Sequence, residues 1–142
     1  AMEINVTAIW HLSKLCAPYM KEAGSGNIVN IASILGLVGS APIKQAHYCA
    51  SKGAVINLTR ELGMQWARRG IRVNALCPGW FPSEMTQGMD DESSMNFMRA
   101  NSPLPRMGEL HELDGALLLL ASDAASFMIG QHVVVDGGWT AR

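Results

Sequence analysis

The chain has 142 residues, a length typical of one domain, and 49% of them are hydrophobic while 16% are charged. This composition excludes disorder driven by low hydrophobicity and high charge, and the net charge of −1 gives no indication of nucleic-acid binding. The longest apolar run, Ala116–Ala121, is too short to span a membrane. Three widely spaced cysteines without a Cys-x-x-Cys pair predict reduced thiols and a cytoplasmic protein.

Helical and strand patterns alternate along the chain, as judged from the spacing of apolar residues and from runs of β-branched residues. The predicted helices cover residues 2–23, 46–69 and 109–121, and the predicted strands cover residues 27–32, 71–77 and 132–135. The segment 80–108 is rich in Met and contains three prolines, which indicates a long loop with short helices. Strands that alternate with helices favour a parallel sheet covered on both faces.

The first predicted helix begins without a capping residue. Ala1-Met2-Glu3 offers no Ser, Thr, Asp or Asn side chain to bind the free amide groups of the first turn. One explanation is a frayed terminus. The interpretation that we prefer is that a segment upstream of Ala1 is missing.

A tyrosine and a lysine four residues apart, in Tyr48-Cys-Ala-Ser-Lys52, share one face of the predicted second helix. A phenol has a reference pKa near 10, and lowering it by ~2–3 requires about 3–4 kcal/mol. An ammonium group about 4–5 Å away supplies a similar energy at an effective dielectric constant of ~20. The spacing therefore predicts that Lys52 lowers the pKa of Tyr48 and makes it a general acid–base. The alternative is an exposed pair without a chemical role.

Two further positions come directly after predicted strands. Ser33 follows the strand at 27–32, and Pro78-Gly79 follows the strand at 71–77. Ligands bind at the carboxyl ends of parallel strands, where a serine hydroxyl can bond a substrate oxygen. The alternatives are a serine that only starts a loop and a proline–glycine pair that only ends a strand.

Four motifs in this order resemble the short-chain dehydrogenase/reductase family. They are Asn27-Ile-Val-Asn-Ile-Ala-Ser33, Tyr48-Cys-Ala-Ser-Lys52, Arg72-Val-Asn-Ala-Leu-Cys-Pro78-Gly79 and Val135-Asp-Gly-Gly-Trp139. The resemblance covers nearly the whole chain and matches the carboxyl-terminal portion of the family. It implies an α/β fold, a partial Rossmann-like, doubly wound parallel sheet made of the last three strands with their flanking helices. The whole chain, 1–142, would then be a single partial domain.

The resemblance also assigns catalytic roles. Tyr48 is the implied acid/base, and Lys52 lowers the pKa of Tyr48 and holds the nicotinamide ribose hydroxyls. Ser33 orients the carbonyl or alcohol of the substrate. Asn5 is similar to a helix asparagine that supports a water molecule in the proton relay, although a neutral polar helix residue is the alternative.

The implied cofactor is NAD or NADP, and the implied reaction is hydride transfer between it and a small-molecule alcohol or carbonyl compound. The family usually has Thr where this chain has Ser83, and Thr86 is a nearby alternative for the same hydrogen bond. The implied cofactor-binding residues are Tyr48, Lys52, Pro78, Gly79, Phe81 and Ser83. No metal, nucleic acid or membrane is expected as a partner.

The resemblance further implies a homodimer or homotetramer that packs through the helices at 2–23 and 46–69. The apolar stripe of the second helix would face a partner subunit or, alternatively, pack only within the chain; it consists of Ala54, Leu58, Leu62 and Trp66. A methionine cluster in the segment 80–108 forms either a pliant wall over the substrate or a gap-filling contact. Its members are Met85, Met89, Met95 and Met98.

The glycine-rich phosphate loop of the family, Gly-x-x-x-Gly-x-Gly, does not precede Asn5, and Gly24-Ser25-Gly26 follows a helix instead of a strand. Two functions therefore remain open. The chain is either the catalytic portion of an NAD(P)-dependent oxidoreductase or a non-catalytic oligomerisation or folding module derived from one. An α/β-hydrolase would need a Gly-x-Ser-x-Gly elbow, which the sequence lacks.

Overall fold

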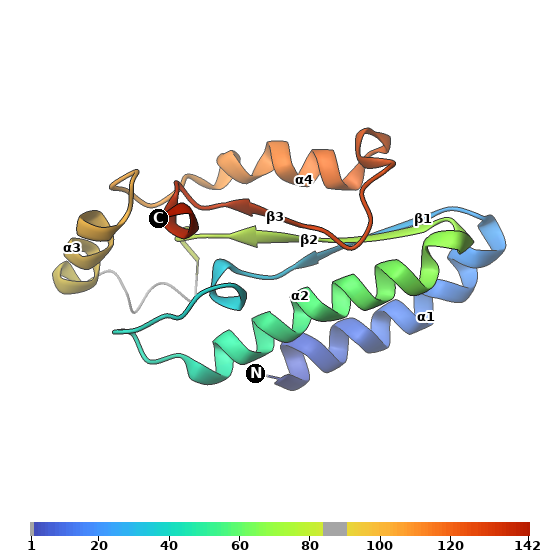
Figure 1. Ribbon diagram of the computed structural model, residues 1–142, viewed down its shortest axis with the longest axis horizontal. Coiled ribbons are helices and arrows are strands. Elements are labelled where there is room, and N and C mark those ends of the chain that lie inside the picture. Colours follow the sequence, from blue (N-terminus) through green and yellow to red (C-terminus); the bar gives the residue numbers. More distant parts are fainter. Residues whose placement is uncertain (1, 84–90) are drawn as a thin grey trace.

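The computed structural model describes residues 2–83 and 91–142, and its centre is a three-stranded parallel sheet (Figure 1). The strands are β1 (Gly26–Ile31), β2 (Ile71–Pro78) and β3 (His132–Val135), in the order β1-β2-β3. β2 pairs with β1 from Gly26↔Ile71 onward and with β3 from Ala75↔His132 onward. The predicted α/β fold with three parallel strands is confirmed, and the fold is Rossmann-like.

Helices cover both faces of the sheet (Figure 1). The helices α1 (Ala8–Ala23) and α2 (Ala46–Trp66) lie on one face, and α4 (Asp114–Ala121) lies on the other. Helix α3 (Glu92–Asn101) stands beyond the carboxyl ends of the strands. Short helical turns are found at Glu3–Thr7, Ile34–Gly36, Ala67–Arg69, Leu110–Leu113, Asp123–Ala125 and Trp139–Ala141. Among the described residues, no helix is long and apolar enough to cross a bilayer.

The central strand β2 supplies most of the core. Ile71, Val73, Ala75 and Cys77 alternate along one face and are fully buried beneath α1 and α2. Central strands of parallel sheets are apolar because helices shield both of their faces. The hydrophobic core therefore lies directly beneath the two long helices.

The apolar residues whose three- and four-residue spacing predicts the first helix face solvent; they are Ile4, Ala8, Leu12, Leu15 and Tyr19. Leu12, Leu15 and Tyr19 are 61%, 56% and 76% exposed, whereas the buried residues of α1 are Ser13 and Ala17. The predicted helix is thus present, but its inner face consists of the small residues Ser13 and Ala17 together with the partly buried Ile9 and Met20.

The stripe of α2 behaves differently. Leu62 and Trp66 are buried and pack within the chain against Ile71 and Val73. For these two residues, packing within the chain is the alternative that the structure supports. These two side chains are therefore not available for contact with a partner subunit.

The glycines at 24 and 26 form a turn at the amino ends of the strands. Gly24 ends α1 with φ 72°, a left-handed conformation that favours glycine. Gly26 begins β1 and donates to the carbonyl of Gly70 across 3.1 Å. Because the strands are parallel, this turn lies at their amino ends, on the opposite side of the sheet from their carboxyl ends.

Candidate active site

Ser33 follows β1 and begins the turn Ile34–Gly36, where its hydroxyl accepts a 3.1 Å hydrogen bond from the amide of Leu35. This turn packs on α2 at Gly36. A Cβ atom on Gly36 would lie 2.7 Å from the carbonyl oxygen of Lys52, which no side chain tolerates. Because Gly36 has no side chain, the turn can lie directly against α2, and Ser33 is thereby placed close to Tyr48 and Lys52.

Tyr48 and Lys52 share one face of α2, as the four-residue spacing predicts. The Lys52 ammonium nitrogen lies 5.7 Å from the centroid of the Tyr48 ring. It donates a 3.0 Å hydrogen bond to the carbonyl of Ile31, the last residue of β1. A side-chain hydrogen bond joins Tyr48 to Ser33. The structure therefore brings these three predicted residues together at the carboxyl end of β1.

The pKa of Tyr48 shifts in the direction opposite to the prediction. Burial raises the pKa of the phenol above its ordinary value of 10.0, and the hydrogen bond with Ser33 opposes that rise only in part. Burial also lowers the pKa of Lys52. The Lys52 ammonium lies beside the Tyr48 ring and bonds the Ile31 carbonyl, and burial sets the direction in which the pKa of the phenol shifts.

Asn5 lies in the π-helical turn Glu3–Thr7 and contacts α2 through Ser51. Its side-chain amide donates to the Ser51 hydroxyl across 3.1 Å, and Ser51 donates to the carbonyl of Tyr48 across 2.8 Å. Single π-helical turns occur often at functional sites. Sequence reasoning missed Ser51, although its position three residues after Tyr48 on one helix face was an available signal.

The end of β2 is held against the end of β3. Gly79 donates to the carbonyl of Val135 across 2.9 Å, and a Cβ atom on Gly79 would lie 2.7 Å from the Cβ of Asp136. The Asp136 carboxylate accepts hydrogen bonds from the amides of Gly138 and Thr140 at 2.9 and 2.8 Å. Asp136 therefore fixes the turn behind the Pro78-Gly79 segment.

A cleft of about 320 Å³ opens at the carboxyl ends of β1 and β2. This volume lies at the lower end of the range for small-molecule sites. The predicted site residues that line it are Ser33, Tyr48, Lys52, Pro78, Gly79, Phe81 and Ser83. Asn5 is not among the lining residues and reaches the site only through Ser51. Thr86, Met85 and Met89 lie outside the described residues.

Cys77 lies in the strand beneath this cleft and is fully buried. Burial raises the pKa of its thiol to about 11, although the backbone of Ser33 and the charge of Lys52 act in the opposite direction. The thiol is therefore protonated and unreactive at neutral pH, because the thiolate is the reactive form.

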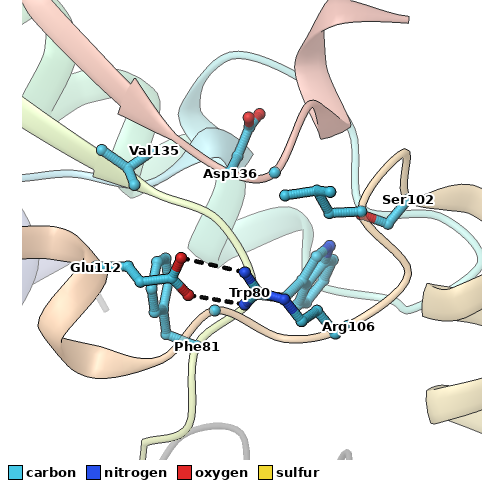
Figure 2. Close-up of a pocket in the computed structure, with 10 residues that line it drawn as sticks. Trp80, Phe81, Ser102, Arg106, Glu112, Val135 and Asp136 are labelled. Atoms are coloured by element: carbon cyan, nitrogen blue, oxygen red, sulfur yellow. Dashed lines mark hydrogen bonds and ion pairs between the residues drawn. The ribbon is translucent and has the colours of Figure 1, made fainter.

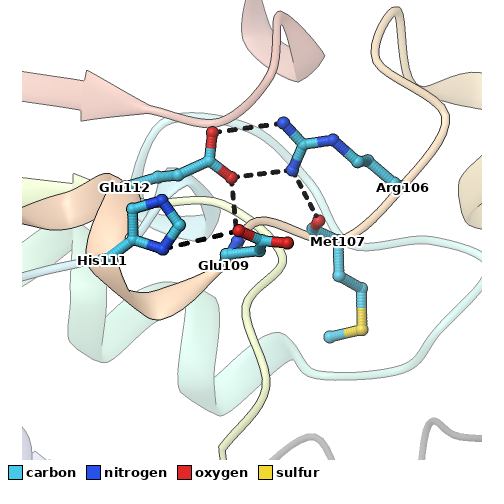
Figure 3. A network of polar contacts seen from close by, with 5 residues as sticks. All are labelled: Arg106, Met107, Glu109, His111 and Glu112. Atoms are coloured by element: carbon cyan, nitrogen blue, oxygen red, sulfur yellow. Dashed lines mark hydrogen bonds and ion pairs between the residues drawn. The ribbon is translucent and has the colours of Figure 1, made fainter.

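A smaller pocket of about 50 Å³ adjoins the cleft and shares Trp80 and Phe81 with it (Figure 2). Arg106 and Glu112 form a two-point ion pair here, with distances of 2.7 and 3.1 Å (Figure 3). The hydrogen bond from Arg106 is the main cause that lowers the pKa of Glu112 to about 2. The positive charge of Arg106 is therefore already paired with the carboxylate of Glu112.

Residues 1–140 match a family profile described as Enoyl-(Acyl carrier protein) reductase. The chain is 41% identical over 140 residues to a cis-4-hydroxycyclohexanecarboxylate dehydrogenase from Sinomonas cyclohexanicum, covering 99% of this chain and 55% of the relative. It is also 41% identical over 143 residues to a gluconate 5-dehydrogenase from Gluconobacter oxydans, covering 98% and 54% of the two chains. The chain thus spans about half the length of these curated relatives.

Solved structures show the same fold. A gluconate 5-dehydrogenase from Burkholderia cenocepacia, in complex with NADP and tartrate, superposes with a TM-score of 0.95 and 37% identity, covering 99% of this chain and 55% of that one. A short-chain type dehydrogenase/reductase from Mycobacterium marinum gives a TM-score of 0.93 and 35% identity, covering 99% and 55%. The strands and long helices are thus arranged as in these solved structures.

Proposed function

The chain belongs to the short-chain dehydrogenase/reductase family, and from this premise we propose that it forms the catalytic portion of an NAD(P)-dependent oxidoreductase. The enzyme would interconvert an alcohol and a carbonyl compound by hydride transfer. The observation that carries the proposal is the meeting of Ser33, Tyr48 and Lys52 in one cleft. The alternative, a non-catalytic oligomerisation or folding module, is not favoured, because the relatives are dehydrogenases and reductases.

The residues of the cleft fit the nicotinamide half of NAD or NADP. The Lys52 ammonium and the Tyr48 hydroxyl are hydrogen-bond donors suited to ribose hydroxyls, and they stand at the carboxyl edge where dinucleotides bind. The wall beside the ring would consist of Pro78, Gly79, Phe81 and Ser83. A bound nicotinamide supplies the hydride. The turn at Gly24–Gly26 lies at the other edge of the sheet, so we assign it no role in binding the phosphates.

Proton handling is the task of the chain's own residues. Burial keeps the Tyr48 phenol protonated at neutral pH, so it can donate a proton to an oxygen that becomes negative during carbonyl reduction. Ser33, which is hydrogen-bonded to Tyr48, would hold the same oxygen in place. In alcohol oxidation, Tyr48 would accept the proton after losing its own.

The test is Tyr48→Phe in the full-length protein that contains this chain. Turnover should fall by roughly 10²–10⁴-fold while nicotinamide cofactor affinity changes little, because only proton transfer is lost. Lys52→Ala should lower both turnover and the affinity for the nicotinamide cofactor. Phe127→Tyr is the control, since this aromatic side chain is fully exposed and does not line the cleft, and it should leave turnover unchanged. Unchanged turnover in Tyr48→Phe would contradict the proposal.

We also propose that the protein is a homodimer or homotetramer that packs through α1. Ile4, Leu12, Leu15 and Tyr19 form an exposed apolar face along this helix, and exposed apolar patches mark interaction surfaces. Native mass spectrometry of the full-length protein should show a homo-oligomer that Leu12→Glu dissociates.

The three free thiols fit a reducing compartment, which supports the cytoplasm as the location.

A further inference from the structure

The cleft carries very little charge. Among the described residues that line it, Lys52 is the only side chain with a formal charge, and its ammonium already bonds the carbonyl of Ile31. The wall on both sides of Ser33 and Tyr48 is mostly apolar. Its largest apolar members are Ile34, Leu35, Trp80, Phe81, Leu110 and Leu113.

The cation of the adjoining pocket is already paired within the chain. Arg106 lines the adjoining pocket, where both terminal nitrogens of its guanidinium bond the carboxylate of Glu112 (Figure 2). One of these nitrogens also donates to the carbonyl of Met107 across 3.1 Å (Figure 3). A substrate carboxylate would have to break this pair in order to find a counter-ion there.

Trp80 connects the cleft to a third, apolar hollow. Its indole lines the cleft, the Arg106 pocket and a space of about 20 Å³, which is room for about one water molecule. Met95, Met98 and Met107 lie behind the indole around this space. Methionine side chains are flexible and adapt to the shape of their neighbours. Trp80 is therefore in contact with side chains that are apolar and flexible.

We propose that the substrate is an uncharged ketone or secondary alcohol with a bulky apolar substituent that packs against Trp80 and the two leucines, Leu110 and Leu113. This inference rests on the proposed oxidoreductase function. Among the described lining residues an ionised carboxylate meets only the Lys52 ammonium, which already bonds the Ile31 carbonyl and which the proposed function assigns to the ribose, whereas an apolar group gains from burial. In the reductive direction the carbonyl carbon accepts a hydride from the nicotinamide, which is oxidised, and the carbonyl oxygen accepts the proton of Tyr48.

The experiment compares two ketones of similar shape, 4-methylcyclohexanone and 4-oxocyclohexanecarboxylate, with the full-length protein and either NADH or NADPH. The neutral ketone should show a kcat/KM at least roughly 50-fold higher, because the carboxylate lacks a counter-ion. Equal or higher kcat/KM for the carboxylate would overturn this inference alone. Failure to oxidise either cofactor with any member of a broad ketone panel would overturn the proposed function, and this inference with it.

A charge variant tests the physical cause. Leu110→Arg places a guanidinium at the cleft, where the native side chain is 61% exposed. The ratio of kcat/KM for 4-methylcyclohexanone to kcat/KM for 4-oxocyclohexanecarboxylate should fall by about tenfold in this variant. Leu118→Arg is the matched control, because this leucine is 67% exposed on α4 and does not line the cleft. It should leave the ratio unchanged. A ratio that is the same in Leu110→Arg as in the native protein would overturn the inference.

Discussion

The side-chain amide of Asn5 donates a 3.1 Å hydrogen bond to the hydroxyl of Ser51, which is fully buried. Ser51 in turn donates to the backbone carbonyl of Tyr48 across 2.8 Å. The π-helical turn at Glu3–Thr7 is thus tied to the first turn of α2. Asn5 acts on the candidate catalytic tyrosine through the backbone of that turn.

A double-mutant cycle on Asn5 and Ser51 measures this link. Ser51→Ala should lower the free energy of unfolding by about 1–3 kcal/mol, because the amide of Asn5 loses its acceptor in a partly buried place. Asn5→Ala should lower the free energy of unfolding by less in the Ser51→Ala protein than in the native protein. The difference, the coupling energy measured by urea unfolding, should be about 0.5–1.5 kcal/mol. Fully additive effects would show that the bond carries no energy.

Gly36→Ala should separate Ser33 from Tyr48. The new methyl group would overlap the backbone of Lys52, so the turn has to move away from α2. We expect kcat/KM to fall at least ~10²-fold, since a small misplacement of a positioning residue is costly, with a loss of about 1–3 kcal/mol of stability. Gly39→Ala is the control, because no atom lies within 4 Å of its added Cβ. Equal kinetics in the two variants would contradict the positioning role.

The raised pKa of Tyr48 predicts different pH profiles for the two directions of the reaction. A pKa above 10.0 leaves the phenol protonated at neutral pH, so kcat/KM for ketone reduction should stay level from pH 7 to 9. Alcohol oxidation needs the phenolate, and its kcat/KM should rise about tenfold for each pH unit over the same interval. A plateau for oxidation that begins near pH 7 would show instead that the phenol has a lowered pKa in the working enzyme.

Local spacing was sufficient to predict the secondary structure and the shared face of Tyr48 and Lys52. The four-residue step on a helix determines which side chains are neighbours, whatever surrounds them. The pKa of Tyr48 was not predictable in this way, because its direction depends on how far the folded chain buries the phenol. The exposed stripe of α1 was misleading for a similar reason: periodicity indicates that a helix has two faces, but not which one meets the sheet.

Close contacts between residues that are far apart in the chain could not be predicted from the sequence either. Gly36 is one of 14 glycines, and only the fold shows that it lies against the backbone of Lys52. Ser51 lies inside the motif from Tyr48 to Lys52, yet its partner Asn5 is 46 residues away. Long-range contacts of this kind depend on how the helices pack, which no local pattern encodes.

The three cysteines should differ in reactivity. Cys16 is exposed, whereas Cys77 is fully buried with a pKa raised to about 11. In the dissociated Leu12→Glu protein, iodoacetamide at pH 8 should label Cys16 quickly and leave Cys77 unmodified until the protein is unfolded, as peptide mass spectrometry can follow. Because the folded-state pKa is raised from 9.0, the contribution of Cys77 to stability is full below pH 9 and is lost as the pH rises toward 11. Cys77→Ala should remove that part of the alkaline destabilisation.

The ion pair of Arg106 and Glu112 makes the final prediction. In Arg106→Gln the carboxylate loses its two-point partner, so the pKa of Glu112 should rise from about 2 toward its ordinary value of 4.5. It should stay somewhat below 4.5, because the amide of Glu109 still donates to the carboxylate across 3.0 Å. Carbon-detected NMR titration of the side-chain carboxyl groups measures this directly.

Arg99→Gln is the control for this titration, since it removes an exposed arginine of α3 and should leave the pKa of Glu112 near 2. The sign of the stability effect follows from the lowered pKa. The contribution of the pair is present above pH 4.5 and is lost as the pH falls toward 2, so the native protein should withstand pH 4 better than Arg106→Gln does. Identical acid unfolding of the two proteins would mean that this exposed pair has no net effect on folding.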